Sequence, residues 1–368
     1  MTAKLRQAAG SLLVAGVAGA ELTALERAWL KQVRPAGIIL FRRNIEDARQ
    51  SRALLAEATA FCAPHSLCCV DVEGGTVDRL RDALAPMPSA QAVATAARKT
   101  GKTSLIREQG ELVARAVKAF GFNTTLAPVL DLALPASGGV MGTRAAVPSA
   151  AGVIEYARGF LAGLAKHGVV GCGKHFPGLG GSALDSHMET PSIRRSWREL
   201  WQEDLSPYRE LRNELPMVMV SHAAYPDTPG KGRPASVSPY WITTVLRKRI
   251  GYLGITFSDD LEMGGILNFM PIEEAAIAAI RSGMDLVEIC HSPKLILRAY
   301  EALIAEGERS AAFRKLLLAR AAQTARKRAR FFAGGVFKAL SAHQLDALRT
   351  RILRFGETIM KVQGVDSA

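Results

Sequence analysis

Eight short apolar runs recur along the chain, and longer amphipathic stretches separate them. They span residues 11–16, 36–41, 67–71, 123–130, 169–175, 216–222, 254–259 and 284–290. Their apolar character is nearly continuous, which is typical of parallel strands that helices cover. Eightfold strand–helix alternation predicts an α/β fold, a single-domain (β/α)8 TIM barrel. A doubly wound open sheet is the alternative, but no G-x-G-x-x-G motif follows the first run.

Helix start and stop signals occupy the gaps between the runs. Helices are expected over residues 45–61, 150–166, 239–251, 271–283, 293–306 and 345–362. Ser149 is placed to cap the second of these, and Gly283 to end the fourth. Asp47 is expected in the first turn of the helix that follows Asn44. These signals support a helix between each strand and the next.

The C-terminal part of the chain is strongly basic. The formal net charge is +13, and no acidic residue lies between Arg309 and Asp346. The basic residues there include Arg314, Lys315, Arg320, Arg326, Lys327, Arg328 and Arg330. An exposed basic face on helices explains this charge, with nucleic acid or membrane affinity as the alternative; no recognised nucleic-acid module accompanies it, so no nucleic-acid partner is expected. We expect residues 1–308 to form the barrel, and residues 309–368 a basic helical extension packed on it.

The N-terminus and the cysteines bear on the compartment. Residues 11–19 resemble a short signal sequence, but the weak apolar run favours a first β-strand. No apolar run is long enough to span a membrane. The five cysteines are odd in number and lack metal-ligand spacing, which favours reduced, buried thiols in a cytoplasmic protein.

Polar residues follow most of the predicted strands, at the end where a parallel barrel carries its functional face. They are Asp71, Glu73, Arg79, Asp131, Arg144, Lys174, His175, Ser221, His222, Asp259 and Asp260. Any one of these could simply cap a helix. Their collection at the same end of successive strands predicts one polar site.

Two groups in this set suit acid/base-assisted nucleophilic catalysis. Asp259 can attack an anomeric carbon and form a glycosyl ester, although it could also cap the next helix. His187 titrates near neutrality and can give and take a proton. Asp185, two residues earlier, can fix its tautomer if the segment is extended. An ordinary loop histidine beside a turn-forming aspartate is the alternative.

Further strand-end groups suit the binding of a sugar. Lys174, His175 and Arg144 are donors, and Asp71 can accept hydrogen bonds from hydroxyl groups. The alternative for these residues is an internal salt-bridge network at the barrel mouth. The Gly74-Gly75 pair allows either a close approach to a ligand or a tight turn.

The motifs together resemble glycoside hydrolase family 3, in particular its single-domain bacterial β-N-acetylhexosaminidases of the NagZ type. They are G-I-I-L-F-R-R-N at 37–44, V-D-V-E-G-G at 70–75, G-T-R at 142–144, K-H-F-P-G at 174–178, D-S-H at 185–187 and S-D-D-L at 258–261. The resemblance covers about residues 13–286. Two-domain relatives take their acid/base glutamate from a second domain, whereas this chain carries Asp185-Ser-His187 on the barrel.

The resemblance implies a retaining exo-β-N-acetylglucosaminidase. Asp259 would be the nucleophile, and His187 with Asp185 the acid/base dyad. Asp71, Arg79, Arg144, Lys174 and His175 would hold the terminal N-acetylglucosamine (GlcNAc). The substrate would be an amino-sugar glycoside, either an anhydro-muropeptide in cell-wall recycling or a chito-oligosaccharide.

No metal or organic cofactor is expected from the resemblance, and the chain would be a monomer or a homodimer. A GlcNAc phosphorylase remains open, because a histidine repels phosphate less than a glutamate would. A sugar-binding sensor without turnover also remains open.

Overall fold

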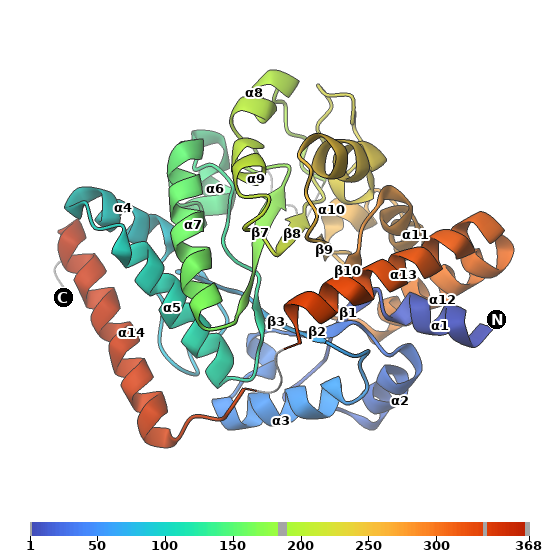
Figure 1. Cartoon of the computed structure of the whole chain (residues 1–368), viewed down its shortest axis with the longest axis horizontal. Coiled ribbons are helices and arrows are strands. Elements are labelled where there is room, and N and C mark those ends of the chain that lie inside the picture. Colours follow the sequence, from blue (N-terminus) through green and yellow to red (C-terminus); the bar gives the residue numbers. More distant parts are fainter. Residues whose placement is uncertain (1, 183–189, 334–336, 365–368) are drawn as a thin grey trace.

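The computed structural model describes residues 2–182, 190–333 and 337–364 of the 368-residue chain (Figure 1). Eight parallel strands close into a barrel in the order β1-β10-β9-β8-β7-β6-β3-β2. The strands are β1 (Leu13–Gly16), β2 (Gly37–Leu40), β3 (Leu67–Val70), β6 (Thr124–Thr125), β7 (Val170–Phe176), β8 (Met217–Val220), β9 (Ile255–Asp260) and β10 (Leu286–Ile289). The predicted barrel is therefore confirmed, and closure rules out the open-sheet alternative.

Helices surround the barrel and connect its strands. The longer ones that follow strands are α2 (Ala24–Val33), α3 (Ala48–Thr59), α4 (Ala90–Thr100), α5 (Ser104–Ala119), α7 (Ala150–Lys166), α11 (Ile272–Ser282) and α12 (Pro293–Arg309), with a π-helical segment η5 over Tyr240–Arg249. Shorter helices include α8 (Trp197–Gln202) and α9 (Ser206–Glu210). The Ser149 cap of α7 and the Gly283 end of α11 are confirmed. Asp47 lies outside the first turn of α3 and caps the helix instead, since its side chain accepts a hydrogen bond from Gln50 N.

A small antiparallel hairpin follows the third barrel strand. It pairs β4 (Val72–Gly74) with β5 (Val77–Asp78). Both turn glycines have positive φ, +92° at Gly74 and +62° at Gly75, which side chains disfavour. A Cβ atom on Gly74 would lie 2.1 Å from the Pro88 carbonyl oxygen. The glycine pair therefore serves a tight turn packed against protein, and the hairpin holds Glu73 and Arg79 beside the barrel mouth.

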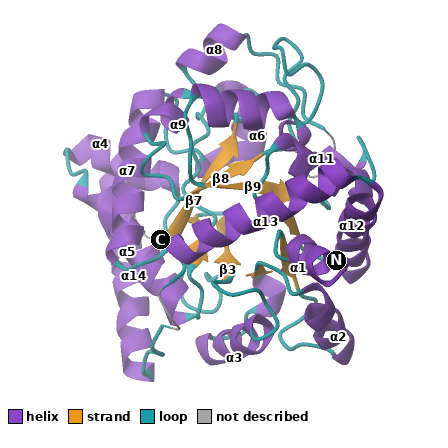
Figure 2. Ribbon diagram, turned by 45° about the vertical axis from the view of Figure 1, so that its right-hand side comes forward, coloured by secondary structure: helices purple, strands orange, loops and turns teal. Residues whose placement is uncertain are grey.

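Helix α13 (Ala311–Phe331) lies across the barrel in Figure 2. Its contacts place it at the N-terminal end of the strands, which we call the bottom. Arg328 donates to the carbonyl of Ala36 at 3.2 Å, directly before β2. Phe332, just past the helix, packs into the cluster of side chains that fills the barrel. The helix therefore covers the end of the barrel opposite the predicted site.

Much of the basic extension is used in packing. Lys327 Nζ lies 2.7 Å from Asp285 Oδ2, and Arg320 Nη1 lies 3.4 Å from Oδ1 of the same carboxylate. Arg328 is only 2% exposed. The expectation of an exposed basic face is thus wrong for these three residues, and it holds for Lys315, Arg326 and Arg330. The periodicity of the charge could not reveal this, because the acidic partner lies far away in the sequence.

Two more helices complete the fold. The N-terminal helix α1 (Thr2–Gly10) was not predicted; it buries Leu5, Ala8 and Ala9 and contacts α12 and α13. Helix α14 (Ala342–Gln363) runs along α4 and α5 on the side of the barrel (Figure 1). All five cysteines are free and buried, as expected. Among the described residues, no helix is both long enough and apolar enough to cross a membrane.

Candidate active site

A cavity of about 310 Å³ opens at the C-terminal ends of the barrel strands. Such a volume lies at the small end of ligand pockets, which run from about 300 to 1,000 Å³. Its lining includes Asp71, Arg79, Arg144, Lys174, His175 and Asp259, together with Phe41, Leu179, Asp260, Glu288 and His291. All six described residues that were predicted for the site therefore meet in one cavity.

Four of the lining and supporting side chains form a chain of charge pairs. Arg144 binds Glu73 with two hydrogen bonds, Nε to Oε2 at 2.8 Å and Nη2 to Oε1 at 2.9 Å. Lys174 Nζ lies 2.6 Å from Glu73 Oε1 and 2.8 Å from Asp71 Oδ1. Burial opposes ionisation of Glu73, but Arg144 and Lys174 outweigh it and lower the pKa of Glu73. The expected donors thus form a salt-bridge network that also faces the cavity.

The buried carboxylate of Asp131 holds the Nδ1 side of the His175 ring. The Nδ1 atom of His175 lies 2.7 Å from Asp131 Oδ2, and the His175 backbone N–H donates to the same oxygen at 3.2 Å. Asp131 Oδ1 accepts from the backbone N–H of Leu179 at 2.6 Å. Asp131 therefore orients the imidazole and anchors the start of the K-H-F-P-G loop at once. The Nε2 atom of His175 is left facing Arg144 Nη2 at 3.4 Å, toward the cavity.

Asp259 lies near the end of β9, partly exposed in the cavity wall. Its Oδ1 accepts a hydrogen bond from the backbone N–H of Asp260 at 3.0 Å. Burial raises the pKa of Asp259, but His175, His222 and Lys174 favour its anionic form, and the net shift is downward. Asp259 is therefore an ionised carboxylate at neutral pH in a substrate-sized cavity, as a nucleophile requires.

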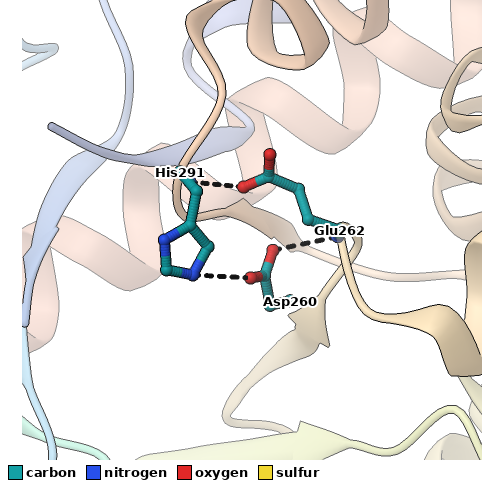
Figure 3. Close-up of side chains that lie close together, drawn as sticks. All are labelled: Asp260, Glu262 and His291. Atoms are coloured by element: carbon teal, nitrogen blue, oxygen red, sulfur yellow. Dashed lines mark hydrogen bonds and ion pairs between the residues drawn. The ribbon is translucent and has the colours of Figure 1, made fainter. Parts of the chain in front are cut away.

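Asp260, Glu262 and His291 form a second polar group on the rim (Figure 3). Asp260 Oδ2 lies 3.6 Å from His291 Nε2, and Asp260 Oδ1 accepts from Glu262 N at 3.0 Å. The Glu262 carboxylate accepts from the backbone N–H groups of His291 and Ser292. One ligand atom from each of the three lies within 4.8 Å of the others, so they could hold a cation. The same hydrogen bonds already join the ends of β9 and β10 without one.

The structure leaves two predicted residues untested. Asp185 and His187 lie outside the described residues, which stop at Ser182 and resume at Thr190. Thr190 Oγ1 donates to the carbonyl of Gly265 at 2.6 Å, and Ser192 bridges to Ala224. The chain that leads out of this segment is therefore fixed beside the β8 and β9 loops.

Sequence reasoning assigned no role to several residues of this site. Glu73 and Asp131 stood among the strand-end polar residues, but only the structure shows that they hold Arg144 and His175. Glu288 and His291 were missed altogether. An acid in the middle of the apolar run 284–290, between Val287 and Ile289, was the available signal for Glu288. His291 follows the last strand directly and could have been found by its position.

A closed parallel barrel with an ionised carboxylate over a cavity rich in hydrogen-bonding groups defines an enzyme that acts on a small polar substrate. The sequence matches the model of the glycosyl hydrolase family 3 N-terminal domain over residues 4–318. The chain therefore belongs to glycosyl hydrolase family 3, and the resemblance drawn from its motifs is confirmed.

Curated relatives agree with this assignment. A β-hexosaminidase of Alkalilimnicola ehrlichii is 37% identical over 287 residues, covering 77% of this chain and 82% of the relative. A β-hexosaminidase of Aromatoleum aromaticum is 38% identical over 283 residues, covering 76% and 79%. The prediction of a glycoside hydrolase is confirmed, and the relatives place the chain with the β-hexosaminidases.

Solved structures show the same likeness. A family 3 β-N-acetylglucosaminidase from a Paenibacillus species superposes with a TM-score of 0.84 at 29% identity, covering 95% of this chain and 68% of that one. Native NagZ from Neisseria gonorrhoeae superposes with a TM-score of 0.77 at 29% identity, covering 97% and 98%.

Proposed function

We propose that the protein is a retaining exo-β-N-acetylglucosaminidase that removes terminal β-linked GlcNAc. The observation that carries this proposal is Asp259, an anionic carboxylate at the end of β9 in the wall of a cavity lined by hydrogen-bonding groups. The family and the names of its relatives supply the reaction class and the sugar. The proposed chemistry is a double displacement through a glycosyl–enzyme ester.

In the first step an oxygen of Asp259 attacks C1 of the sugar, and the C1–O bond to the aglycone breaks. His187, in its imidazolium form, gives its proton to the departing oxygen, while Asp185 holds its other nitrogen. In the second step neutral His187 takes a proton from water. The resulting hydroxide attacks C1, and the ester to Asp259 breaks. Two inversions leave the β configuration unchanged.

The remaining predicted residues bind the sugar in this proposal. Lys174 and Arg144 present cationic donors, and their positions are fixed by Glu73. Asp71 accepts from hydroxyl groups, with Arg79 Nη2 placed 3.6 Å from its Oδ2. His175, oriented by Asp131, offers Nε2 to the cavity. Rigid partners hold these groups before substrate arrives, so little ordering cost is left for binding.

We propose a GlcNAc-containing muropeptide of cell-wall recycling as the natural substrate, in the cytoplasm. The support for the compartment is that all five cysteines are unpaired and buried, as reduced thiols of a cytoplasmic protein would be. Support for the substrate comes from the likeness to NagZ from Neisseria gonorrhoeae. Chito-oligosaccharides share the same terminal sugar and are the natural comparison.

The test is hydrolysis of p-nitrophenyl β-N-acetylglucosaminide beside the matching β-glucoside, with and without phosphate, by wild type and Asp259→Ala. Selective cleavage of the GlcNAc substrate, lost in the variant, is expected. Phosphate-dependent release of GlcNAc-1-phosphate would identify a phosphorylase instead. Cleavage of neither substrate by folded protein that still binds GlcNAc would identify a sugar sensor.

A further inference from the structure

Glu288 is an acidic residue in an otherwise apolar stretch of the barrel interior. It lies on β10, where Leu286 and Cys290, two positions to either side, both belong to the cluster that fills the barrel. Alternate residues of a strand share a face, so Glu288 points inward as well. It lines the catalytic cavity with the apolar side chains Ile39 and Met219. Glu288 thus forms part of the cavity floor, below the strand-end groups.

The hydrogen bonds of the fold do not account for this side chain. Glu288 is 2% exposed, and its Oε1 atom has no hydrogen-bond partner among the described residues. Its backbone N–H donates to Ser258 Oγ at 3.0 Å. A buried polar atom without a partner destabilises the folded protein, because it has lost its hydrogen bonds to water. Because Glu288 lines the cavity, a ligand bound there can supply the missing partner.

The charges around Glu288 decide which form it takes. Burial and the negative charges of Asp260, Asp71 and Asp259 raise its pKa well above the usual value, and Lys174 opposes them. Lys174 is already shared between Asp71 and Glu73. Burial and these neighbouring charges therefore favour the protonated form of Glu288. A carboxylic acid can donate one hydrogen bond and accept another, which matches a sugar hydroxyl group.

We propose that Glu288 is a specificity-determining residue whose side chain exchanges a hydrogen bond with one ring hydroxyl of the bound sugar, at the floor of the cavity. The inference rests on the proposed function, because it takes the terminal sugar as the occupant. It adds a contact to the predicted set of Asp71, Arg79, Arg144, Lys174 and His175. The cost of an unsatisfied acid in the free enzyme is then repaid when substrate binds.

The test compares Glu288→Gln, which keeps a neutral donor, with Glu288→Met, which keeps length without polarity. Both are assayed with p-nitrophenyl β-N-acetylglucosaminide and its 3-, 4- and 6-deoxy analogues. We expect Gln to keep kcat/KM within about threefold, and Met to lose roughly 10- to 100-fold, as for one buried hydrogen bond. On the one analogue that lacks the partner hydroxyl, wild type and Glu288→Met should have equal kcat/KM.

The melting temperature separates the proposed contact from a purely structural role, for which Glu288→Met should lower it. Replacing an unsatisfied buried acid with an apolar side chain should raise the melting temperature of Glu288→Met, even as its activity falls. Met219→Leu, a change in the same cavity floor, should affect the parent substrate and all three analogues equally. The proposal is overturned if Glu288→Met loses nothing on the parent substrate, or loses the same factor on every analogue.

Failure of the proposed function would look different. If wild type turned over none of these glycosides, calorimetric titration of wild type and Glu288→Met with GlcNAc and its deoxy analogues would still decide the role of Glu288. A weaker Kd in the variant for all sugars except one deoxy analogue would support the contact. Equal Kd values for wild type and variant would overturn it.

Discussion

The two ends of the barrel each carry a buried cluster of charges, and the clusters differ in what they leave unpaired. At the bottom, Asp285 Oδ2 receives Arg247 Nη2 at 2.6 Å, Lys327 Nζ at 2.7 Å and the backbone N–H of Thr256 at 2.9 Å. Arg320 approaches the other oxygen at 3.4 Å. At the mouth, Glu73 is just as tightly bound, but its partners open onto a cavity with Asp259 and Glu288.

We infer from this difference that the charges at the bottom stabilise the fold and that those at the mouth serve catalysis. At the bottom, the Asp285 carboxylate is fully buried, and Arg320 and Lys327 of α13 cover it. The mouth cluster holds its cations in place while leaving Asp259 reachable from the cavity. Residue types alone do not separate the two clusters; the presence of unsatisfied groups beside a cavity does. We therefore propose that residues 309–368 are an extension that stabilises the barrel, with no part in its chemistry.

The largest expected effect is at the mouth. Asp259→Asn should lower kcat by roughly 10⁴-fold or more, because the amide cannot form the glycosyl ester. Its melting temperature should stay near that of wild type, since Asp259 makes few fixed contacts. Steady-state kinetics on the aryl GlcNAc substrate and thermal unfolding check both halves. A variant with near-normal kcat would remove Asp259 from the mechanism.

The matched change at the bottom is Asp285→Asn. It leaves Arg247, Lys327 and Arg320 facing a neutral group, so the free energy of unfolding should fall by about 3–5 kcal/mol. The kcat of the protein that remains folded should stay within about threefold of wild type. Urea unfolding and active-site-normalised assays measure the two, with exposed Asp346→Asn as the control. A selective loss of kcat would contradict the division between the clusters.

Two arginines allow a finer comparison. Arg144→Lys loses the two-pronged contact with Glu73, so KM should rise by about tenfold or more. Arg247→Lys loses contacts to the carbonyls of Tyr252 and Gly254, so it should lower stability and leave KM unchanged. Kinetics and melting temperatures of both variants test this. Parallel behaviour of the two would mean that the clusters do not differ in role.

The smallest expected effect is on the pH dependence of stability. Asp260 at the mouth and Asp285 at the bottom should contribute to it with opposite signs. Burial raises the pKa of Asp260 to about 7, above the ordinary unfolded value of about 3.9. The folded protein then binds a proton that the unfolded chain releases, so Asp260 makes stability fall as pH rises from about 4 to 7.

At Asp285, burial opposes ionisation, but Arg247 and Lys327 outweigh it and lower the pKa. Its contribution is present above about pH 4 and is lost as pH falls through the folded pKa. Urea unfolding at pH 4, 5.5 and 7 should show a flatter curve between pH 4 and 7 for Asp260→Asn, by at most about 1.4 kcal/mol per pH unit. If the pH slope of the unfolding free energy were the same for Asp260→Asn as for wild type, the upward shift assigned to the Asp260 pKa would be wrong.

Local patterns predicted the barrel well because the sequence signals of a strand or a helix lie within a few neighbouring residues. All eight predicted runs became barrel strands, and the strand-end rule brought Asp71, Lys174 and Asp259 together correctly. Helix α1 was missed because it directly precedes residues 11–19, and the interpretation of the N-terminus rested on that run.

The pairings of the charges could not be predicted. Asp285 meets Lys327, and Glu73 meets Arg144, across long stretches of sequence that only the closed barrel brings together. The same applies to Glu288, because an acid inside an apolar run does not reveal whether it faces a cavity or a helix. The spacing of these residues in the sequence does not indicate which charge cluster is buried by protein and which one faces the cavity.

The most direct test of the central claim is trapping of the glycosyl–enzyme ester. A 5-fluoro glycosyl fluoride of GlcNAc should react quickly with the nucleophile and leave slowly, since fluorine slows both steps and the fluoride is a good leaving group. Mass spectrometry of peptides from the treated enzyme should find the added sugar on Asp259, and none in Asp259→Asn. A sugar attached to another carboxylate, or steady turnover of the reagent with no adduct, would contradict the account.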